Sequence, residues 1–305
     1  MSNSIDAVQN ESCTENPCQV IKRIIRPGKK SLGGFSVRRA LPHPSQRLVG
    51  PWIFFDHAGP ADFPPGEGVD VRPHPHINLA TVTYMFEGQF MHRDSLGNAQ
   101  AIKPGDINLM VAGKGIVHSE RTPDELRGPG STLHALQLWL ALPEADEEIE
   151  PAFYHYDSAD IPRLEVEAVS VRVMMGSAFG ATSPVKTFAE TLYLEAELKA
   201  GQSLRLPNAE ERALYVAKGE LEIDAEPVQA YSMAVLVAHS DITVTAKTDS
   251  RIALIGGEKL SQRHIWWNFV SSRKERIEQA KQDWKDGKFA TVPGDSEEFI
   301  PLPES

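Results

Sequence analysis

Residues 72–120 read RPHPHINLATVTYMFEGQFMHRDSLGNAQAIKPGDINLMVAGKGIVHSE, and this stretch decides the fold class. Short runs rich in β-branched and aromatic residues alternate in it with turn signals, as is typical of β-strands. The segments SLGN (95–98) and KPGD (103–106) predict tight turns, because Gly and Asn accept positive φ and Pro fixes φ at a turn value. Strands at this spacing predict a sandwich or a barrel.

The same pattern continues through the rest of the chain, which we expect to be all-β with one C-terminal helix. Strands are expected at residues 52–55, 79–86, 89–93, 107–111 and 133–142, and then at 169–175, 191–198, 213–216, 221–223, 234–237, 242–246 and 252–255. Late in the chain the spacing of the apolar residues becomes helical. A capping-box pattern at 272–275 and an apolar stripe at Ile277, Ala280 and Trp284 predict a helix that ends at Gly287.

The length of 305 residues suggests two domains, because single cores rarely grow beyond roughly 250 to 300 residues. The acidic, proline-bounded segment 142–151 is predicted to be a surface connection between them. The predicted organisation is a flexible tail, a first domain, a second domain that includes the helix, and a loosely held tail, at 1–19, 20–150, 151–290 and 291–305. Both cysteines, Cys13 and Cys18, fall in the first tail, and we expect them to be reduced.

Charge and composition exclude several classes of protein. A formal net charge of -11 argues against direct binding to nucleic acid or to an anionic membrane surface, since a polyanion would be repelled. No run approaches the roughly 20 apolar residues of a membrane span, and the first residues lack the layout of a signal peptide. These features predict a cytoplasmic protein.

Two pairs of polar residues stand at alternate positions and could bind a metal ion. His74 and His76 point to the same face if residues 72–76 form a strand, and His118 and Glu120 have the same spacing. Together they offer three nitrogens and one oxygen, which suits a borderline divalent ion. Each pair taken alone is better explained as a surface or hydrogen-bonded pair, and the second pair is the weaker indication of the two. With no cysteine among them, they favour an open site over a closed structural zinc site.

Several short motifs occur in one order, and their sequence resembles the pirin family of the cupin superfamily. They are HPH (74–76), TVTY (81–84), EG (87–88), HRDSLGN (92–98), PGD (104–106), MVAGKGIVHSE (110–120) and LHALQLWLALP (133–143). The resemblance runs from about residue 20 to 288. It implies a bicupin, in which two β-barrels (double-stranded β-helices) lie face to face, followed by a C-terminal helix. It also implies that the first barrel alone holds a metal.

The resemblance implies that this metal is ligated by His74, His76, His118 and Glu120. Many other cupins have a further glutamate a few residues after the first histidine pair, and this chain has Ala80 at that place. Glu120 is therefore expected to be the sole carboxylate ligand. We expect one divalent ion, Fe(II) first, with Zn, Ni, Mn and Cu as alternatives.

Several pirins are quercetin 2,3-dioxygenases, so the resemblance implies a metal-dependent dioxygenase acting on a flavonol or a related enolisable aromatic. Its partners would be that small molecule and dioxygen, with Glu120 as ligand or as the base that takes the hydroxyl proton. The alternative is a redox-sensing regulatory protein that binds a protein partner. Because two barrels in one chain already supply the packing that single-barrel cupins gain by dimerising, we expect a monomer.

An internal comparison explains why a single site is expected. Residues 87–90 (EGQF) resemble 218–221 (KGEL), and 109–112 (LMVA) resemble 235–238 (VLVA), so the second half reads as a weak copy of the first, unless the similarity is due to chance. The residues predicted to stand opposite the four polar ones are Arg205, Pro207, Val244 and Ala246. None of them completes a metal site.

Other polar and aromatic residues receive simpler interpretations. His92 and Asp94 are expected to stabilise the hairpin through side-chain to backbone hydrogen bonds. His57 could lie behind a metal ligand or be structural, and Gln137 could orient a ligand. The tryptophans Trp139, Trp266 and Trp267 are interpreted as core or interdomain packing.

Overall fold

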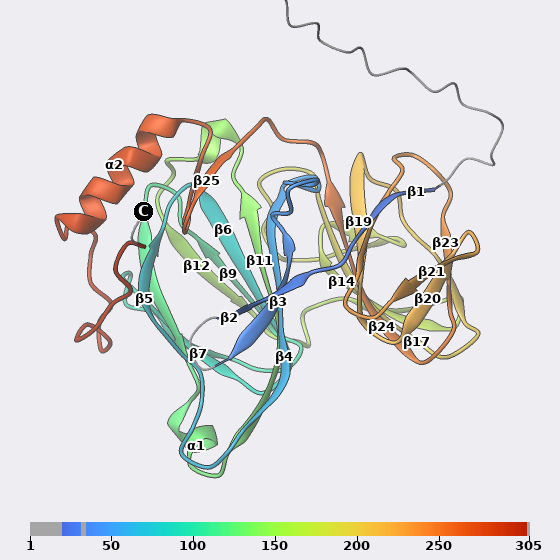
Figure 1. Cartoon of the computed structure of the whole chain (residues 1–305), viewed down its shortest axis with the longest axis horizontal. Coiled ribbons are helices and arrows are strands. Elements are labelled where there is room, and N and C mark those ends of the chain that lie inside the picture. The colour runs from blue at the N-terminus through green and yellow to red at the C-terminus, as the bar shows by residue number, and fades with distance from the viewer. Residues whose placement is uncertain (1–19, 32–34, 304–305) are drawn as a thin grey trace, which may run out of the picture.

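The computed structural model describes residues 20–31 and 35–303, and two β-barrels lie side by side in it (Figure 1). Cys13 and Cys18 lie outside the described residues. Each barrel consists of a seven-stranded and a four-stranded sheet, and all strand pairs within these sheets are antiparallel. The predicted bicupin architecture is confirmed.

The first barrel comes mainly from the first half of the chain. In spatial order its large sheet contains β12 (Ala152–Tyr156), β9 (Ile107–Val111), β6 (Leu79–Glu87), β11 (Ser131–Ala141), β4 (Trp52–Phe63), β3 (Ser36–Leu41) and β2 (Gly28–Ser31). Its small sheet contains β5 (Asp70–His76), β10 (Ile116–Arg121), β7 (Phe90–Asp94) and β8 (Ala99–Ile102). A short helix, α1 (Asp124–Arg127), and a 3-10 turn, η1 (Glu144–Asp146), precede and follow β11.

The second barrel repeats this arrangement. Its large sheet contains β1 (Ile21–Ile25), β22 (Met233–Leu236), β19 (Glu211–Lys218), β24 (Ser250–Gly257), β17 (Thr191–Leu198), β14 (Val169–Met175) and β13 (Arg163–Val166). Its small sheet contains β18 (Ser203–Arg205), β23 (Thr243–Ala246), β20 (Glu220–Ile223) and β21 (Glu226–Gln229). Two small ribbons complete the strands, β15 (Ser177–Ala178) with β16 (Ala181–Thr182) and β25 (His264–Trp266) with β26 (Phe269–Ser271).

The two barrels exchange their outermost strands. Strand β1, at the start of the described chain, pairs with β22 in the second barrel, and β12 pairs with β9 in the first (Figure 1). β1 precedes the first barrel in sequence but belongs to the second, and β12 follows residue 150 but belongs to the first. The boundary at residue 150 stays a prediction, because the chain passes between the barrels more than once.

The main hydrophobic core lies between the two large sheets. Side chains such as Phe55 and Leu138 from the first barrel pack in one cluster with Tyr193, Tyr215 and Ile255 from the second. A separate aliphatic cluster fills the inside of the second barrel. Burying one face of each large sheet against the other supplies the free energy that joins the barrels face to face.

The C-terminal helix α2 (Lys274–Lys285) packs against the ribbon of β25 and β26, on the side of the first barrel (Figure 1). The predicted capping box is wrong, because Arg273 is the N-cap and makes no side-chain cap. Ser272 instead donates its amide (2.7 Å) and its hydroxyl (2.8 Å) to the carboxylate of Glu147. Glu147 is 2% exposed and also pairs with Arg263 Nε at 3.0 Å.

The acidic segment 142–151 is thus more than a surface connection, because Glu147 anchors the start of the helix. The tail after residue 291 is likewise not loose, since Arg121 pairs with Asp295 at 2.7 Å and with Glu298 at 2.9 Å. The amide of Ile300 donates to the carbonyl of Pro73 at 2.8 Å, next to His74. Within the described residues, neither helix has the length and apolar character needed to cross a membrane.

Candidate metal centre

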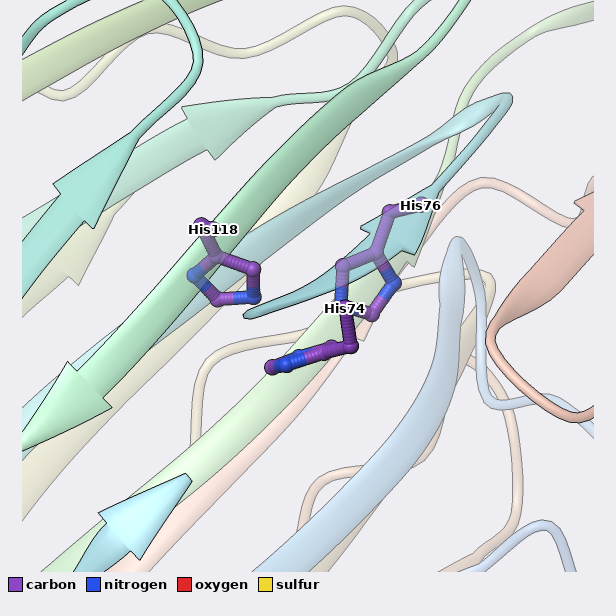
Figure 2. Close-up of side chains that lie close together, drawn as sticks. All are labelled: His74, His76 and His118. Carbon is purple, nitrogen blue, oxygen red and sulfur yellow. The ribbon is translucent and has the colours of Figure 1, made fainter. Parts of the chain in front are cut away.

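Two neighbouring strands of the small sheet bring three histidines together. His74 and His76 lie on β5, and His118 lies on β10, directly opposite His74 in the antiparallel register. Their rings converge in Figure 2, and one nitrogen of each lies within 4.8 Å of the others. Alternation along a strand explains this arrangement, since residues two apart face the same side.

The turn at residues 112–115 (AGKG) leads into β10 and requires glycine at position 113. Gly113 has a φ of +48°, and a Cβ atom there would lie 2.0 Å from the carbonyl oxygen of Ile149. No residue with a side chain fits this position, because the backbone approaches too closely.

Hydrogen bonds orient the rings of His74 and His76. His74 Nδ1 donates to the carbonyl oxygen of Arg72 at 2.8 Å, and His76 Nδ1 donates to that of Asn268 at 3.1 Å. A carbonyl can only accept, so in each neutral ring the proton sits on Nδ1. Nε2 therefore keeps its lone pair for a metal ion.

Two further side chains, His92 and Asp94, orient the ring of His118. Nδ1 of His118 lies 3.4 Å from Nδ1 of His92, whose Nε2 lies 2.9 Å from the carboxylate of Asp94. Burial opposes the ionisation of Asp94, but hydrogen bonds from His92 and Asn98 outweigh it and lower the pKa of its carboxyl. In the tautomer whose Nε2–H donates to Asp94, Nδ1 of His92 can accept from His118.

The residues fit a metal ion. Nε2 of His118 is buried and has no hydrogen-bond partner among the described residues, which is costly unless something else binds it. Burial lowers the pKa of His74 to about 4 and lowers the pKa values of His76 and His118 well below the usual value. All three imidazoles are thus neutral at pH 7, the state in which they ligate divalent metals.

Glu120 lies in the same pocket but is not a member of the group of three imidazoles. A register shift between His118 and Glu120 changes the pairing of β10 with β5. Thr83 Oγ1 lies 3.4 Å from the Glu120 carboxylate and 2.9 Å from Oε1 of Gln137. Burial raises the pKa of Glu120 to about 7, although the hydrogen bond from Thr83 lowers it. Its role as fourth ligand stays a prediction.

The histidines open into a largely apolar pocket of about 380 Å³ in the first barrel. Phe54 and Trp139 stack on one wall with ring centroids 3.9 Å apart, and Trp139 meets the ring of His76 edge-on at 5.0 Å. Asp56 and Arg39 form a bidentate pair on the same lining, at 2.8 and 2.7 Å. Burial raises the pKa of Asp56, and the hydrogen bond from Arg39 only partly offsets it.

Several secondary residues differ from expectation. Trp139 and Trp267 pack in hydrophobic clusters, as expected, and in addition they line the pocket, whereas Trp266 only packs beside α2. Their sequence pattern carries no signal for this difference. Asp94 does stabilise the hairpin, accepting from the amides of Leu96 (2.9 Å) and Asn98 (3.1 Å), while His92 contacts His118 instead.

His57 and Ala80 face away from the metal pocket. His57 Nδ1 lies 2.9 Å from Tyr215 Oη, and its Nε2 lies 2.7 Å from Nε2 of His134, so it belongs to the boundary between the barrels. Ala80 packs in the core between the large sheets. The place on β6 (Leu79–Glu87) that faces Glu120 is occupied by Thr83.

The second barrel has aliphatic side chains where the first has its site. In the first barrel His118 pairs with His74, and in the second Val244 pairs with Leu204. The predicted equivalents Arg205 and Pro207 are therefore wrong by one residue, and a slip of one reverses the face of a strand. The residues that occupy the site are Leu204, Leu206, Val244 and Ala246, all of them buried.

Comparison with known proteins shows which family the chain belongs to. Its sequence matches the family Pirin over residues 34–140 and the Pirin C-terminal cupin domain over residues 193–290. This chain belongs to the pirin family. A pirin-like protein of Caulobacter vibrioides is 46% identical over 280 residues, covering 90% of this chain and 97% of that protein. A pirin-like protein of Solanum lycopersicum is 34% identical, covering 91% and 94%.

A solved structure supports membership of the pirin family at the level of the whole fold. The crystal structure of a quercetin 2,3-dioxygenase from Acinetobacter baumannii superposes with a TM-score of 0.86 at 35% identity. The match covers 93% of this chain and 95% of that one, so both barrels and the connections between them are shared.

Proposed function

We propose that this pirin is a metal-dependent dioxygenase that acts on a flavonol of the quercetin type or a related enolisable aromatic. The observation that carries the proposal is the cluster of three neutral imidazoles in the wall of an aromatic-lined pocket. The similarity to a quercetin 2,3-dioxygenase from Acinetobacter baumannii supports the same reaction class.

The three histidines would hold one divalent ion, for which we propose Fe(II), with Zn, Ni, Mn and Cu as alternatives. A bound redox-active ion would supply Lewis acidity and electron exchange with dioxygen. Three imidazoles and at most one carboxylate leave coordination positions free on an octahedral ion, which a purely structural site does not need.

The protein residues would bind the substrate and take its proton. The stacked rings of Phe54 and Trp139 offer a flat apolar wall to an aromatic ring system. Glu120, whose pKa burial raises to about 7, is suited to accept a hydroxyl proton near neutral pH. Thr83 would hold the carboxylate in place during that transfer.

Anaerobic reconstitution with Fe(II), followed by quercetin and then air, tests the proposal. We expect oxygen consumption together with loss of the flavonol absorbance in metal-loaded protein. Parallel samples with Ni(II), Mn(II), Cu(II) and Zn(II) identify the ion that supports turnover. A fully metallated series with no oxygen-dependent loss of absorbance would refute the dioxygenase proposal.

Two variants separate the role of the base from that of a ligand. Glu120→Gln keeps the size of the side chain but cannot accept the proton, so it should lose more turnover than metal. His118→Ala removes an imidazole of the cluster and should lose both. Equal loss of metal in the two variants would show that Glu120 acts as a ligand and not as a base.

A second candidate is a regulatory protein whose metal state alters its binding to a protein partner. The observation that favours it is that Arg121, next to Glu120, holds the C-terminal tail through Asp295 and Glu298, so site and surface are linked. Pull-down from native cytosol with the Fe(II) and the Fe(III) form tests it. A partner that follows the redox state, without turnover, would favour regulation. The monomeric state and the cytoplasmic location stay predictions.

A further inference from the structure

A second cavity, of about 220 Å³, lies at the boundary between the barrels and shares no lining residue with the metal pocket. Tyr84 and Phe86 of β6 line it from the first barrel, and three arginines, Arg163, Arg172 and Arg251, line it from the second. Among the described residues, no Asp or Glu lines it. Such a concentration of positive charge is unusual in a chain whose net charge is -11.

The strand register places two of these arginines side by side. Arg163 on β13 lies directly opposite Arg172 on β14, and Arg172 in turn lies opposite Glu195 on β17. Like charges at directly opposed positions destabilise a sheet unless something lies between them. Within the described part of the chain, Arg163 has no side-chain hydrogen bond and no ion pair.

Arg172 is buried, 9% exposed, and its guanidinium contacts only neutral groups among the described residues. It donates to the carbonyl oxygens of Gly105 at 2.8 Å and Ser158 at 3.2 Å, and it lies 3.3 Å from Tyr84 Oη. A buried charge is normally paired with an opposite charge, because solvation by water has been lost. Among the described residues Arg172 forms no ion pair, because Glu195, which lies opposite it on β17, pairs with Arg251 instead.

The nearby carboxylates are already engaged. Glu195 accepts from Tyr84 Oη and pairs with Arg251 Nε, while Arg251 also pairs with Glu197 at 2.8 Å. Both carboxylates are therefore paired with Arg251, and neither forms an ion pair with Arg163 or Arg172. Arg251 closes the far wall, with its guanidinium carbon 4.4 Å from the centroid of Phe86.

We infer that this cavity binds a small oxyanion, the carboxylate or phosphate group of a metabolite, between Arg163 and Arg172. Guanidinium groups bind both kinds of anion through charged hydrogen bonds. The guanidinium of Arg163 can offer its fork to the anion, while that of Arg172, whose end is held by Tyr84, Gly105 and Ser158, adds its charge and its remaining N–H groups. Arg163 is exposed and stands at the entrance, whereas Arg172 is fixed at the base by the first barrel. The bound anion would neutralise the arginine pair and link the barrels.

Calorimetric titration tests the inference, using inorganic phosphate and malonate as separate probes in a chloride buffer of constant ionic strength. We expect saturable binding of at least one probe to the whole chain. Saturation by phosphate alone, by malonate alone or by both supports the site and identifies the group. Absence of saturable binding for both would overturn it.

Single substitutions test whether the anion binds at Arg163 and Arg172. Arg163→Gln, at an exposed position, should raise the Kd by about tenfold, as expected for one lost charged hydrogen bond. Arg172→Lys keeps the charge but loses the hydrogen bonds that fix the guanidinium at Gly105 and Ser158, and should also raise the Kd. The matched control is Arg205→Gln, which removes another exposed arginine of the same barrel and should leave the Kd unchanged. An anion effect through the metal centre would be equal in Arg163→Gln and Arg205→Gln, and that result would contradict the inference.

Discussion

Nδ1 of His76 lies 3.1 Å from the backbone carbonyl oxygen of Asn268, which is 192 residues further along the chain. A ring of the first barrel is therefore oriented by the turn between β25 and β26, close to the C-terminal helix. Trp267 of the same turn lines the metal pocket. The candidate metal centre therefore combines two adjacent strands of the first barrel with the turn that precedes the C-terminal helix.

His118 is oriented by a side chain and His76 by a backbone carbonyl, so mutation of the two partner residues should affect metal binding differently. His92→Phe keeps a ring that can stack on Phe153 (4.3 Å between centroids in the native chain) but removes the partner of His118. We expect its metal affinity to fall by about 10- to 100-fold. Asn268→Ala keeps the carbonyl that binds His76 and should retain the native affinity. Competition with a chelating dye measures both, and equal losses would contradict this account.

The pairing of β18 with β23 predicts which residues of the second barrel are important for its stability. Leu204→Ala removes a side chain that is 1% exposed, so the free energy of unfolding should fall by about 2–5 kcal/mol. Arg205→Ala, one residue further, removes an exposed side chain and should change it by less than about 0.5 kcal/mol. Denaturant titration measures both. Sensitivity at 205 together with tolerance at 204 would favour the alignment expected from sequence.

His57 should make the protein less stable in acid. Burial, followed by the charges of His134 and Arg38, lowers the pKa of His57 to about 3. The unfolded chain therefore binds a proton below pH 6.5 that folded His57 does not bind. The free energy of unfolding should consequently decrease by about 1.4 kcal/mol for each pH unit that is lost between pH 6.5 and 3.

Replacing that ring tests the sign of the effect. His57→Gln cannot gain this proton, so its free energy of unfolding should fall less steeply between pH 6.5 and 5 than that of the native chain. His239→Gln changes an exposed histidine and should keep the native slope. Urea unfolding at several pH values gives the slopes. Parallel slopes for His57→Gln and the native chain would show that His57 does not cause the acid sensitivity.

Arg121 is expected to hold the C-terminal tail against the small sheet. Arg121→Gln removes its ion pairs with Asp295 and Glu298, and backbone amide exchange at 295–300 should rise severalfold. Arg127→Gln is the matched control, because Arg127 shares only Asp70 with Arg121 and contacts no tail residue. Hydrogen exchange with mass spectrometry measures both variants. Unchanged exchange in Arg121→Gln would show that the contacts of Ile300 and Trp284 alone hold the tail.

Much of the fold could be predicted because each expected strand carries its own period and its own turn signals. The segment 79–86 is rich in β-branched and aromatic residues and lies between breakers, and it forms most of β6. The edge strands β1 and β12 were not expected; β1 pairs with a strand more than 200 residues away in sequence, and β12 is separated from β9 by β10 and β11. The helix was expected from its stripe, but its cap was wrong because Ser272 binds the distant Glu147.

The sequence predicted which polar side chains share a face, because residues two apart on a strand point to the same side, and the family resemblance implied that the two pairs form one site. The pairing of β5 with β10 brings the three imidazoles together. Only the tertiary structure decided how those rings are oriented and what surrounds them. His76 depends on Asn268, His118 on His92, and the pocket wall on Trp139 and Trp267. These contacts join segments whose separation along the chain has no local signature, so packing of the two barrels and the C-terminal turn had to bring them together.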